Sequence, residues 1–279
     1  MSLRTDLPPA VAIIPPGGWP GWGLAEAWRL RSTCLVLARR SLRVRYRQTL
    51  VGALWAVLQP LLMMVVFTTF LSVIAGVRSD GTPYPVFIYA GLLLWGAVAK
   101  TVAEGTTSLI AESGLIRQVW FPRVYCPAAA MIGSLVDLAI GALVLVGFLV
   151  VYGIPLTPTV LLAPLFLGLA LVAALGIALW TSALNAAWRD VGHLLPFLLQ
   201  VWLFTSPIVY PASLIPAELR LVYALNPLVA AVGGFRWAIF GGAPPEIAEI
   251  AVGGLVALAV LVSGYAFFRL REPSFVDVV

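Results

Sequence analysis

The chain has 279 residues, of which 61% are hydrophobic and only 10% are charged, and its formal net charge is +5 at pH 7. This composition excludes an ordinary soluble domain, in which about 25% of the residues are charged. The basic residues lie between apolar runs, so the positive charge indicates membrane topology and not a nucleic-acid surface.

Long stretches without charge divide the sequence. Residues 48–77 form a run of thirty residues without a charged side chain, and 138–188 form a run of 51. Because an α-helix rises about 1.5 Å per residue, about 20 apolar residues cross the core of a bilayer. The sequence therefore predicts an all-α polytopic membrane protein with six transmembrane helices, at about residues 50–77, 84–108, 124–151, 158–184, 192–210 and 247–269.

Arginine residues gather in alternate segments between these spans. Seven of them lie between Arg29 and Arg47, ahead of the first span. The others on the same side follow the second, fourth and sixth spans: Arg117, Arg123, Arg189, Arg269 and Arg271. Since basic loops stay in the cytoplasm, the pattern predicts that both termini are cytoplasmic.

Residues 24–48 have the periodicity of an amphipathic helix, with Trp28 on its apolar side. Its polar side carries Arg39, Arg40, Arg43 and Arg47. Such a helix is expected to lie in the plane of the membrane interface, although the same charges also fit a positive-inside flank with no further role. Residues 1–23 are rich in proline and glycine, and we expect a flexible lead-in there.

Pro60 stands inside the first predicted span, next to Gln59. A proline frees one backbone carbonyl, which a membrane tolerates where protein or a watery cavity satisfies it. Trp55 and Gln59 are four residues apart and share a helix face. This face either lines a passage or packs against a neighbouring helix.

Three charged residues lie in the interior of the second and third predicted spans. Lys100 and Glu104 are four residues apart in the second span, so they can form a pair, and either a structural pair or a transport role fits them. Asp137 lies in the third span, and the sequence does not name its partner.

Residues 211–249 do not fit a seventh span. Asn226-Pro227 interrupts their apolar run, and a further crossing would carry Arg269 and Arg271 to the outer side. Two short half-helices that enter the outer leaflet and return, within about 211–240, fit better.

The residue types needed for catalysis are scarce. Lys100 is the only lysine and stands in no Walker A motif, so this chain is not expected to bind ATP. His193 is the only histidine, and Cys34 and Cys126 have no metal-ligand spacing, so no metal site is expected. A lipid-modifying enzyme would need a polar catalytic constellation that the sequence does not show. The sequence thus predicts a conduit with no catalytic residues and no cofactor of its own.

The segment RYRQTLVGALWAVLQP at 45–60 strongly resembles the start of the first span in permeases of polysaccharide-exporting ABC transporters, the type-2 exporter superfamily. Further similar segments follow in the same order along the chain: YAGL at 89–92, LIRQVWFPR at 115–123, LVD at 135–137, WRDV at 188–191, YP at 210–211, NPL at 226–228 and EPSFVDVV at 272–279. The resemblance covers about residues 28–279.

This resemblance implies a homodimer of six-span subunits in the bacterial cytoplasmic (inner) membrane. Each subunit would pair with a separate cytosolic ATPase that holds ATP and magnesium. It also implies an interface helix at 24–48, a transmembrane permease domain at 49–279, and re-entrant outer gate helices at about 211–240. A coupling helix at about 111–121 would dock on the ATPase through Glu112, Leu115, Ile116, Arg117 and Phe121.

The implied cargo is a lipid-linked polysaccharide, with O-antigen as the first candidate and teichoic acid, capsule or a small molecule as the alternatives. The first and fifth spans would line its channel. Aromatic rings can stack on sugar faces and Gln59 can bond hydroxyl groups, although each of these side chains could equally belong to the core. The candidates are Trp55, Gln59, Phe67, Phe70, Trp202, Phe204 and Tyr210.

Overall fold

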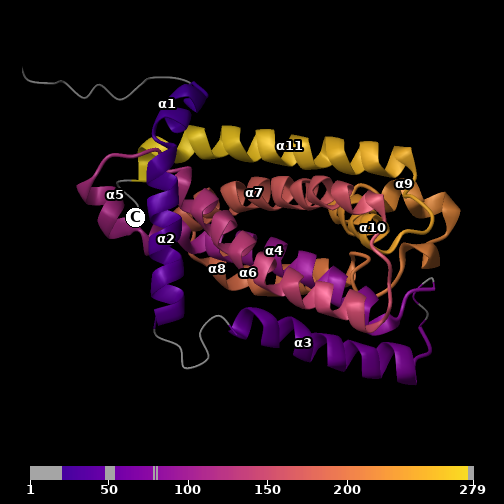
Figure 1. Cartoon of the computed structure of the whole chain (residues 1–279). Helices are drawn as coiled ribbons and strands as arrows, with labels where there is room; N and C mark the ends of the chain where they lie inside the picture. Colours follow the sequence, from indigo (N-terminus) through magenta and orange to yellow (C-terminus); the bar gives the residue numbers. More distant parts are fainter. Residues whose placement is uncertain (1–20, 48–53, 78, 80, 276–279) are drawn as a thin grey trace, which may run out of the picture.

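Figure 1 shows a computed structural model of the chain, which describes residues 21–47, 54–77, 79 and 81–275. Within these residues the protein is helical and has no strand, which confirms the predicted all-α fold class. Five helical segments are long and apolar enough to cross a membrane. Three of them are the helices α4 (Tyr84–Ala111), α6 (Tyr125–Val151) and α11 (Ile247–Arg271), and a 3-10 turn at Glu272–Ser274 follows α11. The segment Trp55–Ile74 consists of α3 (Trp55–Phe67) and the π-helix Thr68–Ile74. The segment Pro158–Ala187 consists of the 3-10 turn Pro158–Leu162 and α7 (Ala163–Ala187).

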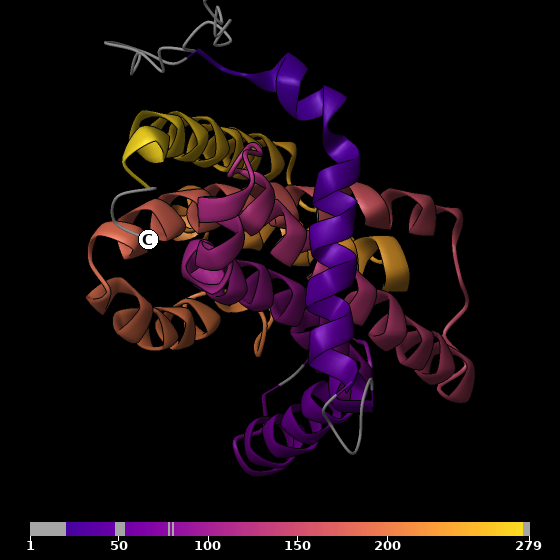
Figure 2. The same cartoon turned by 90° about the vertical axis from the view of Figure 1, so that its left-hand side faces the viewer.

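The two ends of the helix bundle differ. Helices α1 (Leu24–Arg29) and α2 (Arg31–Arg47) lie across one end, nearly perpendicular to the long helices, together with α5 (Ser113–Gln118) (Figures 1 and 2). We call this the basic end and the opposite one the distal end. Arg31 donates a hydrogen bond to the Trp28 carbonyl (3.2 Å) at the break between α1 and α2. Residues 1–20, most of the expected lead-in, lie outside the described part.

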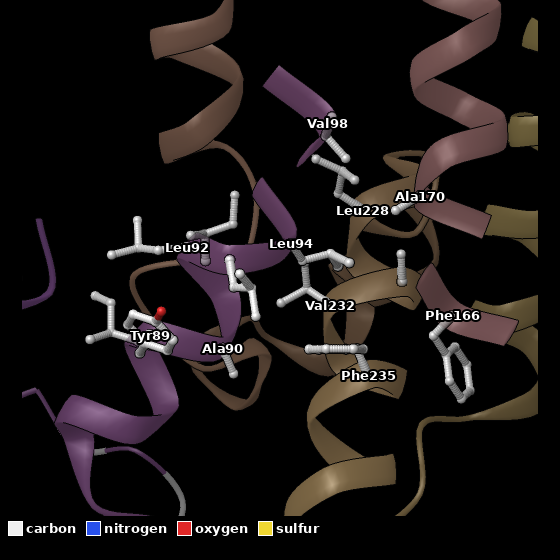
Figure 3. Packing of buried hydrophobic residues seen from close by; sticks show 14 of the residues in the cluster. Tyr89, Ala90, Leu92, Leu94, Val98, Phe166, Ala170, Leu228, Val232 and Phe235 are labelled. Carbon is white, nitrogen blue, oxygen red and sulfur yellow. The ribbon is translucent and has the colours of Figure 1, made fainter. Parts of the chain in front are cut away.

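Helix α10 (Pro227–Phe240) packs into the centre of the distal half. Figure 3 shows its Leu228 beside Val98 of α4 and its Phe235 near Phe166 of α7. These side chains belong to one buried cluster that joins α4, α7 and α10. Gly234 allows the close approach, because a Cβ there would collide with the Phe166 ring. The core is thus built around a helix that is too short to cross the membrane by itself.

The fifth span differs from the prediction of one helix at about 192–210. Helix α8 (Asp190–Phe204) has 15 residues and is about 22 Å long, whereas the hydrocarbon core is about 30 Å thick. The chain continues through turns at 205–209, in which residues 206–209 are buried and the regular hydrogen bonding of a helix is lost. The expectation of a helix to residue 210 is therefore wrong.

Side chains from distant parts of the sequence satisfy the carbonyls of this turn segment. Arg236 donates to the carbonyls of Pro207 (2.5 Å) and Ile208 (2.6 Å), and also to that of Phe87 (3.2 Å). The Tyr84 hydroxyl donates to the carbonyl of Val209 (2.7 Å). Non-helical backbone inside a membrane protein is tolerated where such donors exist, so these contacts explain why the span can end in turns.

The segment between α8 and α11 is bent. The short helix α9 (Arg220–Tyr223), with the turn before it, meets α10 at 108°, with the break at Asn226-Pro227. Asn226 caps α10 by accepting from the Leu228 amide (3.1 Å). Its side-chain amide donates to Ser206 Oγ (2.8 Å) and so fixes the break against the turns after α8. Two short helices thus lie in this segment, and their return through the outer leaflet and their function as a gate stay predictions.

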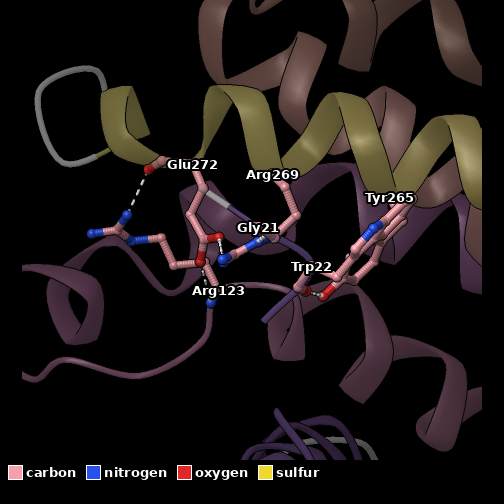
Figure 4. Close-up of polar contacts among 6 residues, drawn as sticks. All are labelled: Gly21, Trp22, Arg123, Tyr265, Arg269 and Glu272. Carbon is pink, nitrogen blue, oxygen red and sulfur yellow. Dashed lines mark hydrogen bonds and ion pairs between the residues drawn. The ribbon is translucent and has the colours of Figure 1, made fainter. Parts of the chain in front are cut away.

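A polar clamp joins the last helix to the other elements of the basic end (Figure 4). Glu272 accepts from the Arg123 amide (3.0 Å) and pairs with Arg269, and Arg269 also donates to the Gly21 carbonyl (3.2 Å). Trp22 stacks on Tyr265 with ring centroids 5.9 Å apart. The clamp therefore ties residues 21–22, α11 and the segment after α5 into one body.

Candidate functional site

A cavity of about 410 Å³ lies between α3, α4, α6 and α8. Three of the predicted channel residues line it: Trp55, Gln59 and Phe67. Pro60 lines it as well, so the helix face chosen from the sequence does border an open space. Trp95 of α4 also borders this space, and the sequence analysis missed it because its run of apolar neighbours gives no sign of a cavity.

An ion pair lies in the wall of this cavity. Lys100 of α4 contacts Asp137 of α6, and both side chains are partly buried. Lys100 is thus the partner of Asp137 that the sequence did not name. Together with the Gln59 amide, the pair gives this mainly aromatic and aliphatic surface hydrogen-bond donors and acceptors, so the cavity can bond polar groups as well as cover apolar ones.

Aromatic side chains continue from the cavity toward the distal end. Trp95 meets Trp202 edge to face at 5.6 Å, and Phe67 meets Phe204 edge to face at 6.4 Å. Trp202 also donates to Asn226 Oδ1 (3.0 Å) and so connects this row to the break before α10.

Tyr210 lies further along, where its hydroxyl donates to the Phe204 carbonyl (3.1 Å) and lies 3.0 Å from the hydroxyl of Tyr223. Phe70 is 60% exposed on the π-helical part of the first span and does not line the cavity. The predicted residues thus form a row from Trp55 to Tyr210, with Phe70 outside it.

The outer faces of α3 and α8 are apolar and exposed. Helix α3 has no buried residue, and α8 buries only Leu195. Among their exposed side chains are Leu62, Val66, Phe197 and Val201. Two of the four helices that border the cavity, α3 and α8, therefore have little cover from the rest of the chain.

The predicted coupling segment forms helix α5 and an extended stretch after it. Glu112 at its start pairs with Arg40 of α2 at 2.9 Å. Ile116 is 6% exposed and Phe121 is 5% exposed, so our expectation that they form part of an open surface is wrong. They pack in the core of the basic end with Phe268 and Phe275, which anchors α5 to the rest of the protein.

The exposed part of this segment consists of other residues. Arg117 is exposed and Leu115 is half-buried, while Trp120 is 65% exposed and Val119 is exposed beside it. The sequence analysis missed Val119 and Trp120. Their apolar side chains could have marked them as candidates for the docking surface, but Ile116 and Phe121 are also apolar and are buried.

Helix α2 buries Cys34, Leu37 and Ala38 against the bundle. Leu35 of the same helix and Trp28 of α1 are exposed. Arg39, Arg40 and Arg43 are exposed as expected, and the side chain of Arg47 lies outside the described residues. Burial raises the pKa of the Cys34 thiol to about 11, so this cysteine is protonated and unreactive at neutral pH.

In the residues that the structure describes, no group of three His, Cys, Asp or Glu side chains could hold a metal ion. The site offers aromatic faces, one amide and one ion pair, without a nucleophile paired to a base. This arrangement can bind and guide a substrate along the row from Trp55 to Tyr210.

Most of the chain is similar in sequence to known proteins. The sequence model for ABC-2 type transporters matches residues 32–240. The chain is 26% identical over 254 residues to the O-antigen export system permease protein RfbA of Myxococcus xanthus, with 90% of this chain and 97% of that protein covered. It is 24% identical over 246 residues to a protein of the same name from Klebsiella pneumoniae (88% and 94% covered). It is also 24% identical over 244 residues to the polysialic acid transport protein KpsM of Escherichia coli (87% and 94% covered).

Proposed function

The chain belongs to the ABC-2 type transporter family, and on that basis we propose that it is the membrane half of an ABC exporter. Its cargo is a lipid-linked polysaccharide, with O-antigen as the first candidate. The family membership confirms the resemblance found in the sequence. ATP hydrolysis is assigned to a separate subunit, since this chain has no Walker A motif.

The observation that carries the proposal is the cavity beside α3 and α8 with its row of aromatic side chains. Aromatic rings stack on sugar faces without demanding one sugar sequence, which suits a polymer that must slide. Gln59 and the Lys100–Asp137 pair supply hydrogen bonds for hydroxyl groups. We propose that this row is the substrate path.

A second copy of the chain is proposed to close the path. The exposed apolar faces of α3 and α8 fit a homodimer in which these helices of both copies surround one channel. The basic end would face the cytoplasm of a bacterium, with α2 at the inner surface of the cytoplasmic membrane, because basic segments stay inside. Residues 211–240 would then lie toward the outer side.

The segment from Glu112 to Phe121 is proposed to dock on the ATPase. Leu115, Arg117, Val119 and Trp120 would form the contact, since aromatic and arginine side chains dominate protein interfaces. Ile116 and Phe121 would transmit the motion to the core in which they are buried.

Deletion of the gene in its own strain tests the function. We expect loss of O-polysaccharide from the cell surface and accumulation of its lipid-linked form inside, with both reversed by the wild-type gene.

Trp120→Asp should leave the permease in the membrane but abolish ATPase co-purification and export. Trp188→Asp, at an exposed tryptophan in the turn between α7 and α8, is the matched control. Unchanged surface polysaccharide in the deletion strain would refute the function, and unchanged ATPase binding by Trp120→Asp would refute the docking surface.

A further inference from the structure

A second polar pocket lies at the distal end, apart from the cavity between α3, α4, α6 and α8. Its volume is about 550 Å³. The residues around it belong to the start of α4, to the segment after α8 and to the segment that joins α10 to α11. Its charged and aromatic lining includes Arg220, Arg236, Trp237, Glu246 and Glu249. Gly241 and Gly242, both with positive φ, form the turn along one side without adding side chains.

The pocket has charges of both signs at fixed positions. Arg220 at its rim pairs with Glu246 at 3.3 Å, and both side chains are partly or fully exposed. Arg236 is 7% exposed, and its guanidinium group is fixed by three backbone carbonyls and by the Phe87 ring, 3.5 Å away. Glu249, half-buried, stands on the side of α11.

This combination favours a neutral polyhydroxyl ligand. Two carboxylates disfavour an anion, and two guanidinium groups disfavour a cation. A sugar can accept hydrogen bonds from arginine and donate to glutamate through the same set of hydroxyls. Trp237, half-buried and held edge to face on Phe166 at 6.3 Å, adds an apolar surface of the kind that covers the C–H face of a sugar ring.

The pocket also lies beside the end of the proposed path. It shares Pro211 and Ser213 with a neighbouring hollow of about 590 Å³. That hollow is lined by Ala75, Gly76 and Val77, immediately after the first span. A polymer that leaves between α3 and α8 at the distal end therefore meets these two hollows next.

We propose that this pocket is an exit-side saccharide site, which binds sugar units of the polymer as they leave the membrane. The site rests on the proposed function, because its ligand is the exported glycan. It holds the emerging chain and so opposes its backward movement between ATP cycles.

Binding to the permease–ATPase complex in nanodiscs tests the site. The probe is the water-soluble polysaccharide released by mild acid from the surface of the strain, followed by saturation-transfer NMR. The double variant Arg220→Gln/Glu246→Gln removes two exposed charges, so folding should be unaffected. Ala243→Trp fills the pocket from its exposed loop. Glu218→Gln, an exposed carboxylate in the same segment that does not line the pocket, is the matched control.

We expect binding about tenfold weaker in both pocket variants and unchanged in the control, with a matching decrease in export by the pocket variants. Wild-type affinity in the Ala243→Trp variant would overturn the site. So would the absence of binding to a wild-type complex that still exports the lipid-linked glycan, and in that case the proposed function would stand. A wild-type complex that exports no glycan would overturn both.

Discussion

Arg236→Met is expected to prevent stable folding of the distal half of the protein. Arg236 is buried and donates to three backbone carbonyls, two of which belong to the turn segment after α8. A buried carbonyl without a donor costs about 1–3 kcal/mol, and the loss of three donors removes much of a typical total stability of about 5–15 kcal/mol. Methionine keeps the length of the side chain, so the effect comes from the lost donors.

The measurement is the amount and thermal stability of the purified protein in detergent. Arg220→Met is the matched control for stability, because Arg220 is a partly exposed arginine at the same end and its pair with Glu246 is exposed. We also expect Arg236→Lys to be strongly destabilised, since one ammonium group cannot reproduce the geometry of a guanidinium fork. Wild-type stability in Arg236→Met would show that the turn segment does not depend on these bonds.

Asp137→Ala is expected to produce the second large effect. The substitution removes the carboxylate that contacts Lys100, at a depth where a charge is costly to keep. Removing one partner of a buried ion pair costs about 3–5 kcal/mol, and the value here is toward the lower end because Lys100 is partly exposed to the cavity.

A double variant separates the fold from transport. Lys100→Met/Asp137→Leu exchanges both charges for apolar side chains of similar size, which often restores stability. We expect stability to recover and export to remain low, because the cavity then lacks its paired donor and acceptor. Full stability of the single Asp137→Ala variant would contradict the structural role, and full export by the double variant would contradict the role in the path.

Hydropathy predicted most of the fold because a membrane span is defined by length and apolar character, which the sequence shows directly. The spans at α4, α6, α7 and α11 lie within a few residues of their expected positions. It did not predict where α8 ends, because the turns after Phe204 belong to a run without charged residues that continues to Ala217. Their carbonyls are satisfied by Arg236 and Tyr84, which are close only after folding.

The same limit applies to the candidate site. The face of Trp55 and Gln59 could be found because a helix places residues four apart on one side. Lys100 and Asp137 are 37 residues apart in the sequence and lie on different helices, so no local sequence pattern predicts their contact. At α5 the sequence indicated an apolar segment, but it could not tell the buried Ile116 from the exposed Trp120, because both are large apolar residues of the same short segment.

Translocation by the purified permease–ATPase complex in proteoliposomes tests the central claim most directly. The substrate is the lipid-linked O-polysaccharide of the strain, incorporated only in the membrane leaflet on the ATPase side. A lectin on the other side of the membrane reports its arrival there. We predict that the lectin signal rises with ATP and magnesium, and that it stays at the background level with a non-hydrolysable ATP analogue. A complex that hydrolyses ATP while the glycan remains on its original side would contradict the claim that this chain forms its path.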